Sequence, residues 1–189
     1  MIRAITLKDI SKLAILHKEV LPSFLAVFPL RFIQRFYLSQ LSRKNQLLLG
    51  YFDEDNLVGF VFGTDNVDDL YSNFIHENKV YFYTQTLLAI AKNPKYILLF
   101  VSKLFSRPFK SPCKRQLVYI AVSKQTIQRG LGSLLVQTLE RHWEQFGYYE
   151  LEVESSNKAY SFYQKHNFYL VHQYNNWVET KLLLGKKLP

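Results

Sequence analysis

The chain has 189 residues, of which 48% are hydrophobic and 21% charged, and this balance is typical of a folded globular protein. A formal net charge of +9 suggests an anionic partner, such as a nucleotide, a coenzyme, a nucleic acid or a membrane surface, but charge alone slightly favours a simple solubilising excess. The single cysteine, Cys113, excludes an internal disulfide framework and a cysteine-based metal site, and it fits a reducing cytoplasm.

The N-terminal part of the chain predicts alternating helical and strand-like segments. Apolar residues at helical spacing, runs rich in β-branched and aromatic residues, and prolines that end helices separate the elements. In chain order we expect a strand, a helix, a loop or broken helix, a second helix and a two-stranded hairpin, over 2–6, 7–20, 22–29, 30–44, 46–52 and 56–63.

The stretch from about 65 to 114 differs from what precedes it. Three segments in it look helical, over 67–78, 84–93 and 95–105, and Pro94 separates the last two. We expect this stretch to be a helical insertion between the third and fourth strands. Its most apolar part, 96–105, is too short to cross a bilayer, which needs about 20 apolar residues.

The C-terminal part predicts strands and helices in alternation. The expected order is a strand, a long helix capped by Gly147, a strand, a helix and a closing pair of strands, over 115–123, 130–147, 148–154, 155–168, 169–175 and 177–184. The chain is therefore expected to be one domain, residues 1–189, of the α/β (α+β) class, with a mixed central sheet flanked by helices.

Two glycines, Gly130 and Gly132, stand where the long helix begins. Glycine weakens a helix, but the first turn of a helix carries unpaired N–H groups and a partial positive charge that suit an anion. Without Cβ atoms at these positions, a diphosphate could approach the backbone, and Gln128, Arg129 and Ser133 could add side-chain contacts. The pattern lacks the Gly-Lys-Ser/Thr ending of a P-loop, and a lone G-x-G is a weak signal by itself.

The strings VYIAVSKQTIQRGLGSLLV and YELEVESSNKAYSFYQKHNF together resemble the GCN5-related N-acetyltransferase (GNAT) superfamily. The matching positions are Val122, Gly130, Gly132, Asn157, Ala159, Phe162, Tyr163 and Phe168. The chain departs from the signature at Ile127, where Gln or Arg is usual, and at Asn167, where Gly is usual. Asn tolerates the left-handed conformation that glycine would supply.

The resemblance implies a GNAT fold and direct attack of an amine on acetyl-CoA, with no metal. Main-chain N–H groups around Ala121 and Val122 would stabilise the oxyanion, and Tyr163 would be the general acid. The residues expected to bind the coenzyme are Ala121, Val122, Gln128, Arg129, Gly130, Leu131, Gly132, Ser133 and Asn157. Asn157 could instead be a simple helix N-cap.

The general base is left open by the sequence. Related sequences often carry a Glu early in the central strand, but this chain has Gln116, which cannot take a proton. Glu152 and Glu154 on the next strand and His17 on the first helix are candidates. An exposed strand and a surface helix would explain these residues without catalysis, and a water relay is an equal alternative.

The acceptor is expected to be the primary amine of a small molecule, with an amino sugar favoured. It would lie over the loop at 22–29 and the insertion, where Phe24, Phe28, Tyr81 and Tyr83 could stack on a sugar or an aliphatic group. The alternatives are a protein or peptide N-acetyltransferase and a non-catalytic acyl-CoA-binding module. Membrane contact through the apolar basic segment 95–110 is not expected, nor is nucleic-acid binding, and the protein would be a monomer or homodimer.

Overall fold

A computed structural model describes residues 1–105, 109, 111–126, 130–175 and 179–189. Within them one seven-stranded sheet has the order β1-β2-β3-β4-β5-β7-β6. The strands are β1 (Ile2–Ala4), β2 (Gln46–Asp53), β3 (Asn56–Thr64), β4 (Gln116–Val122), β5 (Tyr148–Glu154), β6 (Tyr169–Asn175) and β7 (Thr180–Lys187). Only β4 and β5 pair in parallel, so the predicted mixed sheet is confirmed.

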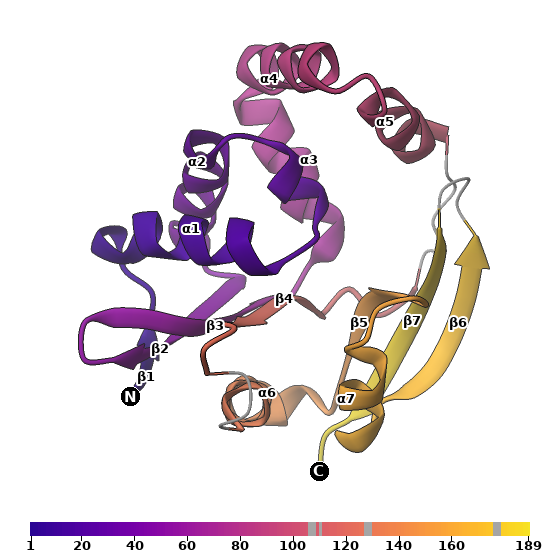
Figure 1. The fold of residues 1–189 in the computed structure, drawn as a ribbon. Helices are drawn as coiled ribbons and strands as arrows, with labels where there is room; N and C mark the ends of the chain where they lie inside the picture. The colour runs from indigo at the N-terminus through magenta and orange to yellow at the C-terminus, as the bar shows by residue number, and fades with distance from the viewer. Residues whose placement is uncertain (106–108, 110, 127–129, 176–178) are drawn as a thin grey trace.

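Helices cover both faces of this sheet (Figure 1). They are α1 (Ile10–Val20), α2 (Leu30–Leu41), α3 (Val67–Glu77), α4 (Lys79–Lys92), α5 (Tyr96–Phe105), α6 (Leu131–Trp143) and α7 (Tyr160–Lys165), with a short 3-10 helix, η2 (Phe24–Val27), between α1 and α2. Helices α1 to α5 lie on one face, and α6 and α7 lie on the other. The three helices expected between 65 and 114 are present, and their status as an insertion stays a prediction.

Two element boundaries differ from those expected. Helix α4 begins at Lys79, only one residue after α3 ends, whereas the pattern placed its start near 84. The helix expected over 155–168 is reduced to α7, because the chain from Ser155 to Ala159 forms turns instead. The left-handed positions agree with the sequence: Asn167 has φ 62°, and Gly147, which follows α6 and its 3-10 extension, has φ 69°.

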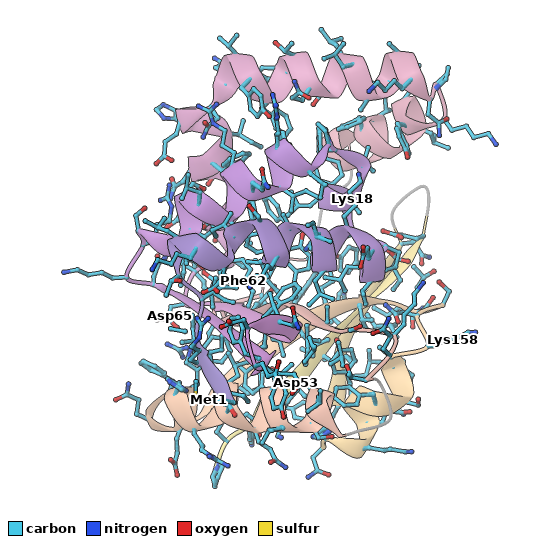
Figure 2. All side chains as sticks on the ribbon, turned by 60° about the vertical axis from the view of Figure 1, so that its left-hand side comes forward. Met1, Lys18, Asp53, Phe62, Asp65 and Lys158 are labelled. Carbon is cyan, nitrogen blue, oxygen red and sulfur yellow. The ribbon has the colours of Figure 1, made fainter. Side chains whose placement is uncertain are left out.

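Each face of the sheet has its own hydrophobic core. The core under α1 to α5 is rich in aromatic rings, and Phe62 of β3 lies within it, between sheet and helices (Figure 2). The core under α6 and α7 is mainly aliphatic and contains Leu135, Leu139 and Leu151. Since side chains of a strand alternate between the faces, both cores draw on the same strands and hold the sheet rigidly between them.

The sheet opens between its two parallel strands. Strand β4 pairs with β5 only at Gln116–Glu150 and Leu117–Leu151, and the ladder ends there. Just beyond, the β3–β4 register skips Val118, so Val118 and Tyr119 both pack into the core under α1 to α5. An extra residue in one strand bends it and changes its direction. This bulge therefore coincides with the place where β4 diverges from β5.

Candidate active site

A cavity of about 470 Å³ lies where β4 and β5 diverge, and we call it the acceptor cavity. Its walls are built from β4, β5, α3, the segment around η2, and the turn and helix that follow β5. The lining residues used below are Ser23, Phe24, Tyr71, Gln116, Tyr119, Ile120, Glu152, Glu154, Asn157, Tyr163, Glu179 and Lys181. This volume is within the usual range of small-molecule sites.

Main-chain N–H groups of β4 face this opening. The Ser123 N–H donates to the Val58 oxygen at 2.8 Å, so Ser123 faces β3. Because backbone groups alternate along a strand, the Ala121 N–H also faces β3, and those of Ile120 and Val122 face the diverging side. Of the two amides expected near the oxyanion, that of Val122 faces the diverging side, as does that of Ile120, whereas that of Ala121 belongs to the β3 ladder.

Gly130 begins helix α6 in the left-handed conformation. Its φ is 70°, and apart from its two chain neighbours no atom of the described residues lies within 4 Å of the position that a Cβ would occupy. The N–H groups of Leu131, Gly132 and Ser133 follow, and the first turn of a helix offers them no partner within the helix. Three donors and the positive end of the helix dipole thus stand behind an open approach.

Besides the approach of a diphosphate that the sequence predicts, the absence of a side chain at Gly132 has a role in helix packing. A Cβ on Gly132 would lie 3.3 Å from the Phe162 ring of α7, so the glycine lets α6 and α7 pack closely. The Ser133 side chain is also engaged, because its Oγ lies 2.9 Å from Nε2 of His166, the residue that follows α7. The main-chain N–H groups remain for an anion. Gln128 and Arg129 lie outside the described residues.

Tyr163 of α7 lies at the bottom of the acceptor cavity. Its side chain is only 7% exposed, and no described residue accepts a hydrogen bond from its hydroxyl. Burial raises the pKa of Tyr163 to about 12. The phenol is therefore protonated at neutral pH, with its proton available to a molecule in the cavity.

Asn157 lies beside Tyr163 in the same wall. Its Oδ1 accepts a hydrogen bond from the Ala159 N–H at 2.9 Å, which closes the turn before α7. The capping role considered from the sequence is therefore present in a turn rather than at the helix start. Asn157 lines the cavity, and with Oδ1 engaged its NH₂ group is the part left for a ligand.

His17 is buried in the core. One interpretation of the sequence placed it on the surface of a helix, and this is wrong. Its exposed fraction is 0%, with Nδ1 2.7 Å from the Tyr37 hydroxyl and Nε2 2.6 Å from Ser23 Oγ. Burial, with a smaller effect of Lys18, lowers the pKa of His17 to about 4. The imidazole is neutral at pH 7 and reaches the acceptor cavity through Ser23.

Acidic residues of β5 form the opposite wall. Lys181 of β7 pairs with Glu154 at 3.4 Å and with Glu179 at 2.7 Å, and the Tyr174 hydroxyl donates to Glu152. Burial and the neighbouring Glu179 raise the pKa of Glu154, although Lys181 opposes this. Both candidate glutamates thus border the cavity instead of pointing only to solvent.

The aromatic residues expected at the acceptor site divide into two groups. Phe28 is fully buried and stacks on Phe32 at 3.9 Å between ring centroids, and Tyr81 stacks on Phe32 at 5.7 Å, so both serve packing. Phe24 lines the acceptor cavity, and Tyr83 lines a second cavity described below.

Sequence reasoning missed several residues of this site. Ser23, Tyr71 and Tyr119 line the cavity, and the Tyr71 and Tyr119 hydroxyls bond to each other. Polar residues in otherwise apolar segments were the available signal, but tyrosine is too frequent in this chain for that signal to stand out. Lys181 and Glu179 were missed because they belong to the far strand β7 and its approach.

The described residues contain no group of three or more His, Cys, Asp or Glu side chains placed to hold a metal ion. Among the same residues, no helix has the length and apolar character needed to cross a membrane. Helix α5, in the most apolar segment of the chain, has Phe100 buried and both Ile97 and Leu98 about half exposed.

Comparison with known proteins gives a family. The model of the acetyltransferase (GNAT) family matches residues 13–168. A comparison with curated proteins finds no significant match.

Solved structures share the fold at low sequence identity. The ribosomal-protein-S18-alanine N-acetyltransferase from Escherichia coli is 14% identical with a TM-score of 0.63, over 100% of this chain and 93% of that one. A GNAT acetyltransferase from Streptococcus pneumoniae is 18% identical with a TM-score of 0.60, over 100% and 99%. An N-acetyltransferase from Thermoplasma acidophilum in complex with coenzyme A is 14% identical with a TM-score of 0.59, over 99% and 98%. Because the family match spans most of the sequence and the fold agrees with it, the chain belongs to the acetyltransferase (GNAT) family.

Proposed function

We propose that the protein transfers the acetyl group of acetyl-CoA to the primary amine of a small molecule by direct attack. The observation that carries this proposal is the acceptor cavity, where free main-chain N–H groups of β4, the phenol of Tyr163 and the carboxylates of β5 meet. Acyl transfer to an amine needs donors for the developing oxyanion, an acid for the departing thiolate and an acceptor for the amine proton.

The coenzyme would lie along the opening with its diphosphate at α6. The N–H groups of Leu131, Gly132 and Ser133 would hold the diphosphate, and Gly130 leaves the approach open. The NH₂ group of Asn157 would contact the coenzyme arm. Gln128 and Arg129 remain candidates for further contacts with the phosphates.

The thioester carbonyl would accept a hydrogen bond from the N–H of Ile120 or that of Val122, because these donors lie two residues apart on one strand, roughly 6.6 Å from each other, and one oxygen reaches only one of them. These donors are fixed by the β3–β4 ladder, so they need little rearrangement as charge develops on the oxygen. As the carbon–sulfur bond breaks, Tyr163 would donate its proton to the departing sulfur. Burial that raises the pKa of the phenol also raises that of a thiol in the same cavity, so the proton transfer stays feasible.

Glu154 is the base that we favour among the three candidates. Burial and the neighbouring Glu179 raise its pKa, which makes its carboxylate a better proton acceptor, and Glu154 borders the same cavity as Tyr163. His17 contacts the cavity only through Ser23, and its low pKa makes it a weak base. The proton of the attacking amine would pass to Glu154 directly or through one water.

A coenzyme titration and a thiol-release assay with a panel of primary amines test this function. We expect coenzyme A to bind and Tyr163→Phe to lower kcat by roughly 10²- to 10⁴-fold, with coenzyme affinity unchanged. Tyr160→Phe, on the same helix but away from the cavity, is the matched control and should keep wild-type turnover.

Each failure of that test has a distinct meaning. Full turnover by Tyr163→Phe would remove the proposed acid. Coenzyme binding without thiol release from any amine would favour a non-catalytic module, and absence of coenzyme binding would refute the proposed function altogether.

A protein N-terminus is the second candidate acceptor. It is favoured by the fold shared with the ribosomal-protein-S18-alanine N-acetyltransferase. Short peptides with free N-termini belong in the same amine panel, and a clear preference for them over all small amines would assign the protein to this alternative.

A further inference from the structure

A second cavity, of about 570 Å³, lies between η2, α2 and helices α3 to α5, and we call it the apolar cavity. The described side chains that line it are uncharged, and their only polar atoms are the hydroxyls of Tyr71, Tyr83 and Thr86. The Tyr71 hydroxyl bonds to Tyr119, and the Thr86 hydroxyl donates to the Phe82 oxygen at 2.9 Å. Close-packed interiors leave few voids larger than a water, so a cavity of this size suits an apolar ligand.

The apolar cavity adjoins the acceptor cavity, since Phe24 and Tyr71 line both. The Tyr71 hydroxyl is held by Tyr119 of β4, on the acceptor side, while the Tyr71 residue also borders the apolar side. The Phe24 ring packs edge-on against Phe28 and Phe100, at 5.5 and 5.3 Å between centroids. Two aromatic side chains therefore lie where the acceptor cavity and the uncharged cavity meet.

We infer that the acceptor is an amphiphilic primary amine with a straight aliphatic chain. This inference rests on the proposed function. The amino group would lie in the acceptor cavity near Glu154, and the chain would pass Phe24 and Tyr71 into the apolar cavity. A free amino sugar fits less well, because its hydroxyls would lose their hydrogen bonds to water without finding partners there.

The placement of the cavity assigns the chain to the amine and not to the acyl group. The elements that would hold the coenzyme, α6 and α7, lie on one face of the sheet (Figure 1). The apolar cavity lies among helices of the other face. Tyr83 and Ile97, which are 52% and 48% exposed, form part of its rim, so a chain can extend to the surface there.

The test uses acetyl-CoA with a series of primary amines from 1-aminobutane to 1-aminodecane, each below its micellar concentration. We expect kcat/KM to rise roughly fourfold for each methylene that enters the cavity, and then to level off once the chain reaches the rim. Equal kcat/KM along the series, or glucosamine acetylated better than every alkylamine, would overturn the inference.

Variants that fill the apolar cavity show whether a gain in kcat/KM with chain length comes from this cavity or only from the hydrophobicity of the longer amines. Thr86→Trp and Ile75→Trp place an indole in the cavity from α4 and α3, and a melting curve by circular dichroism shows whether each folds. Both should remove the gain with chain length and keep the turnover of 1-aminobutane. Leu87→Trp is the matched control, because Leu87 is 68% exposed and outside the cavity lining. A folded Thr86→Trp protein with the full gain would refute the site.

Two further measurements distinguish this inference from the proposed function. Calorimetric titration of 1-aminodecane into the protein with coenzyme A needs no turnover, and binding should be lost in Thr86→Trp and kept in Leu87→Trp. Turnover of 1-aminobutane without any gain for longer amines would sink the inference alone. The same assay with 1-aminobutane compares decanoyl-CoA with acetyl-CoA. A higher kcat/KM for decanoyl-CoA that is lost in Thr86→Trp would assign the cavity to the acyl group and overturn the inference.

Discussion

Buried His17 should make the stability of the protein depend on pH in a defined window. The imidazole has no exposed surface and satisfies both nitrogens with the hydroxyls of Tyr37 and Ser23. A neutral imidazole can donate from one nitrogen and accept at the other, which matches two hydroxyl partners. Protonation would place an uncompensated charge in an aromatic core, and this is why the pKa of His17 falls to about 4.

The magnitude follows from the difference between the folded and unfolded pKa values. The unfolded chain takes up a proton on this side chain near pH 6.5, whereas the folded chain does so only near pH 4. Between these values the unfolded state binds more protons, so the free energy of unfolding decreases as the pH falls. The decrease attributable to His17 at pH 4 is about 3 kcal/mol relative to pH above 7.

Urea unfolding of the wild type and of His17→Gln at several pH values from 7.5 to 4 measures this effect. Other groups titrate in both proteins, so the difference between the two curves isolates the imidazole. The difference at pH 7.5 gives the packing cost of the substitution, and the further change down to pH 4 should favour the variant by about 3 kcal/mol. With a typical urea dependence this is a relative shift of roughly 1–2 M in midpoint. Parallel curves over the whole window would refute the buried, neutral imidazole.

Three further outcomes are expected. Gly130→Ala should destabilise the protein by about 1–2 kcal/mol in urea unfolding although no atom obstructs its Cβ, because φ is 70°, and an unchanged midpoint would contradict the left-handed start of α6. Asp9→Asn should flatten the loss of stability below pH 4, since the two hydrogen bonds from Arg3, at 2.7 and 2.9 Å, hold the pKa of the Asp9 carboxyl well below its usual range; an equally steep acid transition would refute this pairing. Gly63→Ala would overlap the indole of Trp143, so a thermal melt should show a loss of roughly 1–3 kcal/mol, and a wild-type melting temperature would show that the packing differs.

The elements of the fold could be predicted because they depend on local patterns. Apolar residues at helical spacing marked α1, α2 and α6, and alternating residues marked β5. Asn167 and Gly147 adopt the left-handed conformations that the pattern expected of them. Hydrogen bonds within a helix and the preference of a side chain for one face need only neighbours in the sequence.

The candidate site was only partly predictable, because its geometry depends on contacts between distant segments. The motif indicated α6, Asn157 and Tyr163, and of these Asn157 and Tyr163 line one cavity in the structure. The motif could not indicate the direction of the Ala121 N–H. Backbone N–H groups alternate between the two neighbouring strands, and the extra residue Val118 shifts this alternation by one position for the rest of β4.

Short patterns along the chain were enough to predict the order of strands and helices, the helix α6 that follows a glycine, and the resemblance to a family. The three-dimensional structure was needed to see that β4 leaves β5 after Leu117, that His17 is buried, and that an apolar cavity adjoins the acceptor cavity. Strand register, burial and cavity shape are set by packing between segments far apart in the sequence, so periodicity cannot specify them.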